Sequence, residues 1–294
     1  MTAAITSNDK STCSPALRLP PPDLVAAQAL EALEEDVGSG DLTAALLPEG
    51  QQSKVEVVTR EDAVLCGRAW FDAVFLHLSE RISIDWQAVD GERIASGQRL
   101  CVLEGPTREL LTGERTALNY LQTLSGTATR ARTYADAVAG LDVRILDTRK
   151  TVPGLRVQQK YAVCCGGCHN HRMGLYDAIL IKENHIMAAG SIGQAIVAAH
   201  DAAPGVQIEI EVESLAELHE ALAAGATHVL LDNFSLEELR QAVEVSDGRA
   251  RLEASGNVDL NRIRQIAETG VDDISVGSLT KNVEALDLSM RFID

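Results

Sequence analysis

The second half of the chain alternates between short apolar segments and longer amphipathic ones. Six apolar segments recur, each next to polar or charged residues: VRIL (143–146), AILI (178–181), IEIEV (208–212), HVLL (228–231), ARLEA (250–254) and ISV (274–276). Short apolar runs separated by helix-length amphipathic stretches predict βα units around a parallel sheet. In a barrel of parallel strands, functional residues gather at the carboxyl ends of the strands. We therefore expect the chemistry of this protein at the residues that end or follow these segments.

The length of this region suits an incomplete α/β barrel of six or seven strands. An open doubly wound sheet is the alternative, although we find no Gly-x-Gly-x-x-Gly turn of a dinucleotide-binding fold. Helices between the later strands are predicted to begin at Ser214, Ser235 and Asp259, which are all good N-cap residues. Glu238 completes a capping box with Ser235.

The first half of the chain has a mixed pattern. Helices are predicted at 23–37 and 69–78, and alternating segments such as KVEVV and RISIDW predict a half-exposed sheet. After Pro106, apolar residues at spacings of three and four predict a long helical stretch, in which Gly126 is a candidate break. The predicted organisation is a tail (1–22), an N-terminal α/β domain with linking helices (23–140), a barrel domain (141–280) and a C-terminal segment (281–294) that packs back on the N-terminal domain.

Composition narrows the classes of function. The chain has 294 residues, of which 46% are hydrophobic, and contains no apolar run long enough to cross a membrane. Its net charge of −17 argues against binding nucleic acid or an anionic membrane over a broad surface. The first 22 residues are polar and Pro-rich without the apolar region of a signal peptide, so we expect a loosely ordered tail on a cytoplasmic protein.

One stretch of this acidic chain is basic. Between residues 144 and 182 seven Lys and Arg face two Asp, an excess of five positive charges. The basic residues are Arg144, Arg149, Lys150, Arg156, Lys160, Arg172 and Lys182, with His169 and His171 nearby. Arg149, Lys150, His171, Arg172 and Lys182 are candidates to hold carboxylates or phosphates. The alternative is a solvated basic face.

The segment IEIEVE places carboxylates on one side of a predicted strand. A helix should cover its Ile and Val side, so Glu209 and Glu211 are expected to point into the barrel, where a carboxylate needs a cation. Asp232 ends the next strand and is positioned to share that cation. Two oxygen ligands suit Mg²⁺. The alternative is an ion pair with Lys150 or Lys182.

Two glycine-containing turns follow late strands, Ser255-Gly256-Asn257 and Gly277-Ser278. Glycine permits close backbone approach, and the last strands of such barrels commonly bind phosphate. The alternative is that both are ordinary turns, which would contain the same residues.

A cysteine cluster offers a competing hypothesis. Cys164, Cys165 and Cys168 lie beside His169 and His171, which would allow a zinc or redox module. So many ligands within eight residues are difficult to arrange around one tetrahedral ion, which disfavours zinc.

Several long segments together resemble the quinolinate phosphoribosyltransferase family. They are LTGERTALNYLQTLSG (111–126), DTRKTVPGLR (147–156), CGGCHNHR (165–172), LIKENH (180–185), EIEVE (209–213), LLDNF (230–234), SGN (255–257) and ISVGSLT (274–280). The resemblance runs from about Glu35 to the C-terminus. The chain departs from it at Cys168 and Ser278, where relatives often have Gly and Ala.

The resemblance implies an N-terminal α+β sandwich domain and the incomplete α/β barrel of type II phosphoribosyltransferases. It implies that quinolinate and phosphoribosyl pyrophosphate react with Mg²⁺ to give nicotinate mononucleotide, pyrophosphate and CO₂. It also implies a homodimer in which Arg115 enters the partner's site.

The residues implied to bind substrates are Arg115, Thr148, Arg149, Lys150, His171, Arg172, Lys182, Glu211, Asp232, Ser255, Gly256, Asn257, Gly277 and Ser278. Lys150, Lys182, Glu211 and Asp232 would be catalytic, with Glu211 and Asp232 at the Mg²⁺. Ser255, Gly256, Gly277 and Ser278 would receive the 5-phosphate.

Three other functions fit parts of the sequence. A related phosphoribosyltransferase that acts on nicotinate would need a single carboxylate clamp, which the dense Arg and His cluster disfavours. A related barrel protein of metal-transport operons would share the motifs with a different ligand. The third is the non-enzymatic zinc or redox module.

Overall fold

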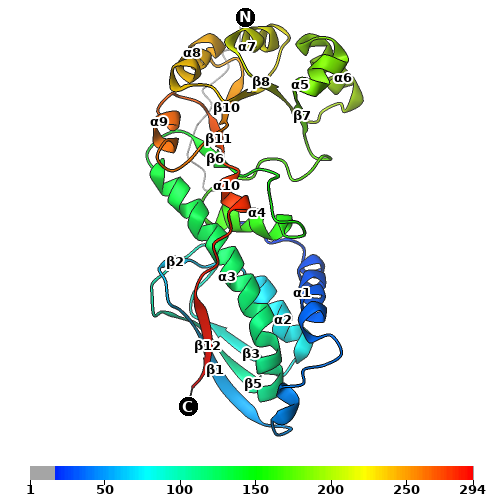
Figure 1. The fold of residues 1–294 in the computed structure, drawn as a ribbon, viewed down its shortest axis with the longest axis vertical. Helices are drawn as coiled ribbons and strands as arrows, with labels where there is room; N and C mark the ends of the chain where they lie inside the picture. Colours follow the sequence, from blue (N-terminus) through cyan, green and yellow to red (C-terminus); the bar gives the residue numbers. More distant parts are fainter. Residues whose placement is uncertain (1–16, 294) are drawn as a thin grey trace, which may run out of the picture. The chain divides into compact units, whose positions relative to one another are not determined.

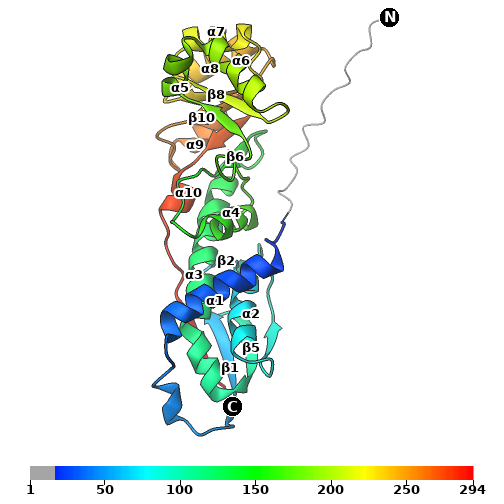
Figure 2. The same ribbon diagram turned by 90° about the vertical axis from the view of Figure 1, so that its right-hand side faces the viewer.

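The computed structural model describes residues 17–293, whose chain path is drawn in Figures 1 and 2. The chain forms two compact units. The barrel unit comprises residues 137–146 and 174–276, and the N-terminal unit comprises residues 17–136, 147–173 and those from 277 onward. The predicted boundary at residue 140 differs from this division, because the basic segment 147–173 packs with the N-terminal unit. Residues 1–16 of the predicted tail lie outside the described residues.

The barrel unit is built on six parallel strands, one for each apolar segment of the sequence pattern. They are β6 (Arg144–Leu146), β7 (Ile179–Ile181), β8 (Ile208–Val212), β9 (His228–Asp232), β10 (Arg251–Ser255) and β11 (Asp273–Ser275). Their order is β6-β11-β10-β9-β8-β7, and every adjacent pair is parallel. Because β6 and β7 do not pair with each other, the barrel is incomplete, as the sequence predicts.

Helices of the barrel unit connect successive strands. They are α5 (Glu183–Ala189), α6 (Ile192–Ala202), α7 (Leu215–Ala223), α8 (Leu236–Ser246) and α9 (Ile263–Ala267). The predicted caps are confirmed at Ser214 and Ser235, and Glu238 completes the capping box. The start predicted at Asp259 is wrong. Its carboxylate accepts the N–H groups of Asn261 and Arg262, which closes a turn before α9 begins.

The N-terminal unit contains an antiparallel sheet in the order β12-β1-β5-β3. Its strands are β1 (Gln52–Thr59), β3 (Ser83–Trp86), β5 (Arg99–Pro106) and β12 (Leu288–Phe292), and β2 (Ala63–Val64) pairs separately with β4 (Arg93–Ile94). Its helical elements are α1 (Pro22–Val37), the 3₁₀ turn η1 (Ala44–Leu46), α2 (Arg68–Leu78), α3 (Thr107–Ala137), α4 (Arg156–Cys165) and α10 (Ser278–Lys281). Strand β12 brings the C-terminal residues to the edge of this sheet, beside β1.

Strand β1 is more buried than its alternating sequence predicts. Val55 and Val57 belong to the main hydrophobic core of this unit. On the opposite face Glu56 is also buried, because Arg99 of β5 and Arg291 of β12 cover its carboxylate. The predicted half-exposed sheet is therefore wrong for this strand.

Helix α3 continues without a break through Gly126. A Cβ at this position would lie 1.9 Å from the carbonyl oxygen of Glu284. The glycine therefore allows the C-terminal segment to pass close against the helix, and the predicted break is absent.

Candidate active site

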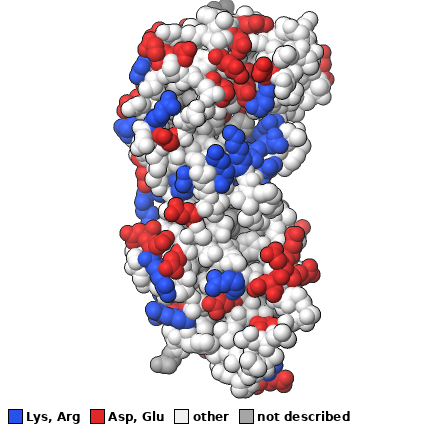
Figure 3. Space-filling view, in the orientation of Figure 1, with Lys and Arg blue, Asp and Glu red and all other residues white. Residues whose placement is uncertain are grey.

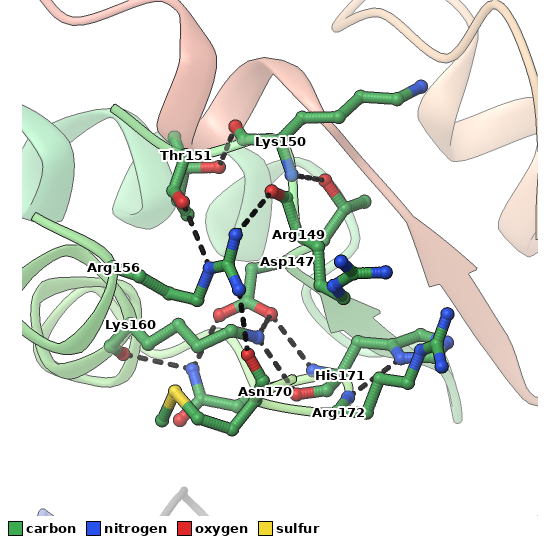
Figure 4. Close-up of polar contacts among 12 residues, drawn as sticks. Asp147, Arg149, Lys150, Thr151, Arg156, Lys160, Asn170, His171 and Arg172 are labelled. Carbon is green, nitrogen blue, oxygen red and sulfur yellow. Dashed lines mark hydrogen bonds and ion pairs between the residues drawn. The ribbon is translucent and has the colours of Figure 1, made fainter. Parts of the chain in front are cut away.

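A buried ion pair organises the basic segment 147–173 (Figure 4). The ammonium of Lys160, on α4, contacts the carboxylate of Asp147, and their side chains are 1% and 0% exposed. Asn170 donates from Nδ2 to Asp147 Oδ2 at 2.6 Å, and the backbone N–H of His171 donates to Oδ1 at 2.9 Å. Burial raises the pKa of Asp147, while Lys160 and these hydrogen bonds oppose that effect. The network therefore ties the residues around Asp147 and those around Asn170 to helix α4.

Arg149 and Lys150 lie two and three residues after Asp147, and their charged ends meet no partner in the described part of the chain. Among the described residues, neither the guanidinium of Arg149 nor the ammonium of Lys150 makes a hydrogen bond or ion pair (Figure 4). The Nε atom of Arg149 is nevertheless buried. Since an orphaned buried donor costs free energy, this arrangement suits a group that binds an anion.

Other basic residues of the stretch 144–182 have structural partners. Arg156 holds Thr151 Oγ1 at 3.1 Å and the carbonyl oxygens of Arg149 and Met173 at 3.3 Å. Arg144, in the barrel unit, is paired with Asp273. Although Figure 3 shows Lys and Arg side chains gathered densely on one face, only part of this charge is free to meet a ligand.

The adjacent residues His171 and Arg172 are held by their backbones. His171 donates its N–H to Asp147 and accepts at its carbonyl from Lys160, at 2.8 Å. The N–H of Arg172 donates to Nδ1 of His171 at 2.7 Å. A neutral His171 therefore carries its proton on Nε2, which is then a hydrogen-bond donor.

The start of α10 lies against Thr148 and Lys150. A Cβ at Gly277 would lie 3.0 Å from Cδ of Lys150 and 3.6 Å from Oγ1 of Thr148. Thr280 donates to the carbonyl of Lys150 at 2.8 Å, and Ser278 Oγ lies 3.1 Å from the hydroxyl of Tyr134. The structure thus brings these predicted residues together.

The barrel unit places a second set of predicted residues at the carboxyl ends of β7, β8 and β9. Lys182 follows β7, and its ammonium contacts Oε2 of Glu211 on β8. Because Glu211 pairs with Leu230 in register, Asp232 lies on the same face of the sheet two residues further along β9. Oε1 of Glu211 and Oδ1 of Asp232 have no hydrogen-bond partner among the described residues.

The turns after β9 and β10 interlock. Ser255 pairs in register with Asp232, and its carbonyl accepts the N–H of Asn233 at 2.9 Å. Gly256 has a φ of +94°, and a Cβ there would lie 2.2 Å from Oδ1 of Asn233. Asn257 donates to the same oxygen at 3.3 Å. Glycine is therefore required at position 256.

The last of the predicted site residues is Arg115. It lies on α3, is exposed, and makes no hydrogen bond or salt bridge with any described residue.

The described structure does not bring together the ligands of the alternative zinc hypothesis in the segment 164–171. Cys168 is buried and donates to the carbonyl of Ala131 at 3.1 Å, and Cys164 donates to Asn170 at 3.3 Å. Within residues 17–293, no three metal-ligating atoms from the segment 164–171 converge.

Sequence reasoning did not assign site roles to Asp147, Lys160 and Asn170. One signal was present, since Asp147 is one of only two acidic residues within the basic stretch. An isolated acid among bases indicates a structural ion pair.

Comparison with known proteins identifies the family. Residues 41–125 match the model of the quinolinate phosphoribosyl transferase N-terminal domain, and residues 127–291 match that of the C-terminal domain. A probable nicotinate-nucleotide pyrophosphorylase (carboxylating) from Bacillus subtilis is 41% identical over 257 residues, covering 87% of this chain and 89% of the relative. The Mycobacterium leprae nicotinate-nucleotide pyrophosphorylase (carboxylating) is 43% identical over 269 residues, covering 88% of this chain and 94% of the relative.

A solved structure shows the same fold. The nicotinate-nucleotide pyrophosphorylase of Francisella tularensis superposes with a TM-score of 0.92 at 44% identity, covering 94% of this chain and 99% of that protein. The two domain matches together span most of the residues that the structure describes. The chain therefore belongs to the quinolinate phosphoribosyl transferase family.

Proposed function

We propose that this protein transfers a phosphoribosyl group from phosphoribosyl pyrophosphate to the ring nitrogen of quinolinate, with loss of CO₂. The products are nicotinate mononucleotide and pyrophosphate, so the protein would serve NAD biosynthesis. The observation that carries this proposal concerns two adjacent cations in a member of this family: within residues 17–293, the guanidinium of Arg149 and the ammonium of Lys150 have no partner. Two unsatisfied cations suit a substrate that carries two carboxylates.

Quinolinate would be held by Arg149, His171 and Arg172. The bidentate geometry of guanidinium matches a planar carboxylate, and Nε2–H of His171 can donate to the same anion. We also propose a homodimer in which Arg115 of the partner subunit completes the clamp. Its exposed position on α3 supports such a role, as does the fact that it forms no salt bridge with any residue that the structure describes.

Phosphoribosyl pyrophosphate would bring most of the negative charge to the site. Lys150 and Lys182 would neutralise part of it. The 5-phosphate would bind at Ser255, Gly256, Gly277 and Ser278, with Thr148 and Asn257 alongside. Backbone N–H groups beside glycine can approach phosphate closely, which is why these turns suit it.

Glu211 and Asp232 fit a Mg²⁺ ion. Each carries one carboxylate oxygen without a hydrogen-bond partner among the described residues, and the two side chains share a face of the sheet. Mg²⁺ binds few carboxylates and keeps water or phosphate oxygens as its other ligands. When bound, it would stabilise the negative charge that develops on the pyrophosphate.

The reaction then needs little acid–base chemistry. The pyridine nitrogen forms a bond to C1′ of the ribose as the bond from C1′ to pyrophosphate breaks, through an oxocarbenium-like transition state. When CO₂ leaves C2 of the ring, the adjacent pyridinium nitrogen stabilises the electron pair until a proton replaces it. Placement of the two substrates and neutralisation of their charge supply most of the rate.

The test is incubation of the purified protein with Mg²⁺, phosphoribosyl pyrophosphate and carboxyl-labelled quinolinate, with nicotinate in a parallel reaction. We expect labelled CO₂ and nicotinate mononucleotide from quinolinate alone. Product from nicotinate alone would assign the protein to the nicotinate-specific reaction. No product from either would favour a binding role such as that of the transport-linked barrel proteins.

A further inference from the structure

Three ligating groups converge in the N-terminal unit outside the proposed substrate-binding residues. They are the thiols of Cys66 and Cys165 and the carboxylate of Asp90, whose ligating atoms all lie within 4.8 Å of one another. The two cysteines are 0% and 2% exposed. The CxxC spacing did not predict this cluster, because its second thiol comes from a residue almost one hundred positions away.

Hydrogen bonds at Cys66 and beside Asp90, together with packing at Cys165, hold the three residues in place before any ligand binds. Ser125 Oγ accepts from the N–H of Cys66 at 2.9 Å and donates to its carbonyl at 3.1 Å. Gly91, next to Asp90, donates to the carbonyl of Leu65 at 2.8 Å. A Cβ on Gly91 would lie 3.5 Å from the carbonyl oxygen of Cys165, so the turn after Asp90 packs directly on the end of α4.

The carboxylate of Asp90 is half-buried, and Arg68 attracts it from beyond salt-bridge distance. Glu56, Asp147 and Asp273 each form a salt bridge with Lys or Arg. Asp90 forms none with any described residue, and instead accepts from the hydroxyl of Tyr161 at 2.9 Å and the N–H of Arg68 at 3.3 Å. A carboxylate in this setting gains from a positive ion nearby.

We propose that Cys66, Cys165 and Asp90 bind one Zn²⁺ ion. Two thiolates and a carboxylate are a donor set that zinc accepts, and zinc–ligand bonds of about 2.0–2.3 Å place the ligand atoms of one ion about 3.5 Å apart. Ligating atoms that already lie within 4.8 Å need only small side-chain movements to reach that geometry. The hydrogen bond from Tyr161 orients the carboxylate, as outer partners commonly do at zinc sites.

The ion would connect three parts of the N-terminal unit. Cys66 precedes α2, Asp90 lies in the turn before β4, and Cys165 is the last residue of α4. Helix α4 also carries Lys160, the partner of Asp147. Zinc would therefore stabilise the helix that anchors the segment of Arg149, in addition to any role of Mg²⁺ in the reaction. The inference does not depend on the proposed function.

The experiment uses the reduced, metal-free full chain and Co²⁺ as a spectroscopic substitute for Zn²⁺. We expect a thiolate-to-cobalt charge-transfer band that saturates at one equivalent and disappears when Zn²⁺ is added. Cys66→Ser and Cys165→Ser should each abolish the band. Cys101→Ser, which changes a buried thiol outside the cluster, should retain it. Absence of the band in the wild-type chain, or its survival in both cluster variants, would overturn the proposal.

Two further measurements test the site even if the cysteine variants fail to fold. A thiol is ordinarily protonated at neutral pH and binds metal as a thiolate, so Zn²⁺ binding to wild-type protein should release protons into a weakly buffered solution. Asp90→Asn should weaken Zn²⁺ binding while keeping both thiols. No proton release, or unchanged affinity in Asp90→Asn, would contradict the site.

Discussion

The ammonium of Lys160 is buried against the carboxylate of Asp147, two residues before Arg149. Both charges are removed from water, so the pair is favourable only because further hydrogen bonds complete it. These come from Asn170 and from the backbone of His171. Arg149, whose guanidinium has no partner among the described residues, thus follows a carboxylate whose hydrogen bonds are made within the same segment.

Lys160→Met should destabilise the protein strongly. The substitution keeps most of the side-chain volume but leaves the carboxylate of Asp147 buried without its cation. Removal of one partner of a buried pair costs about 3–5 kcal/mol. Urea unfolding measures the change. Lys281→Met is the control, because Lys281 is exposed and should change the unfolding free energy by less than about 0.5 kcal/mol. Equal stability of the two variants would show that the ion pair does not support the fold.

Arg149→Ala should lose quinolinate binding without losing stability. The guanidinium has no partner among the described residues, so its removal breaks no hydrogen bond or ion pair within them. Each charge-assisted hydrogen bond to the substrate is worth about 1.5–3 kcal/mol, so Kd should rise at least about tenfold. Calorimetric titration with quinolinate measures the affinity, and a thermal melt measures stability. Arg93→Ala, which removes an exposed ion pair with Asp136, should leave Kd unchanged. Wild-type affinity in Arg149→Ala would contradict the assigned role.

A mixture of Arg115→Ala and Arg149→Ala subunits should recover activity that neither variant has alone. If Arg115 acts in the partner's site, a mixed dimer contains one site with both arginines. Up to about half of the dimers would then be mixed, so we expect up to about a quarter of wild-type activity, since each mixed dimer restores one of two sites. The measurement is the rate of product formation after subunit exchange, verified by mass-tagged chains. No recovery despite exchange would place Arg115 outside a shared site.

Asp273 should contribute to the loss of stability in acid. Burial raises the pKa of Asp273, but hydrogen bonds from Arg251 and Arg144 outweigh burial and hold the pKa below its usual value. A carboxylate with a lowered pKa in the folded state stabilises above its unfolded pKa of about 3.9, and this contribution is lost as pH falls through the folded value. Unfolding free energies from about pH 6 down to about pH 3 should therefore fall less steeply for Asp273→Asn than for wild type. Asp201→Asn, at an exposed position, should follow the wild-type slope.

The strands of the barrel unit were predictable because each is a short apolar run with polar residues at its end. The positions of Lys182, Glu211 and Asp232 follow from that pattern, since parallel strands bring their carboxyl ends together. The partners of the basic side chains could not be predicted from that pattern. Arg156 and Lys160 have the same residue types as Arg149 and Lys150, but their partners are backbone carbonyls and Asp147, which tertiary packing supplies.

Contacts between segments that are distant in the sequence could not be predicted for the same reason. The sequence gives no sign that Cys66 and Asp90 meet Cys165, because the residues come from three separate elements. Gly126 shows the limit of local propensity. Glycine weakens a helix, which made a break reasonable, yet the residue is there for the close approach of the Glu284 carbonyl.

Gly126→Ala should therefore destabilise the protein, although alanine is the better helix former. Propensity alone favours alanine by about 1 kcal/mol. The added Cβ would lie 1.9 Å from the carbonyl oxygen of Glu284, a backbone atom that can retreat only if the C-terminal segment moves. Gly193→Ala is the matched control within helix α6, where the new Cβ would meet only Ala224 at 3.8 Å, so this variant should be neutral or stabilised by up to about 1 kcal/mol. Urea unfolding of both variants separates the two effects. If Gly126→Ala were as stable as Gly193→Ala, the C-terminal segment would not be held against α3 in solution.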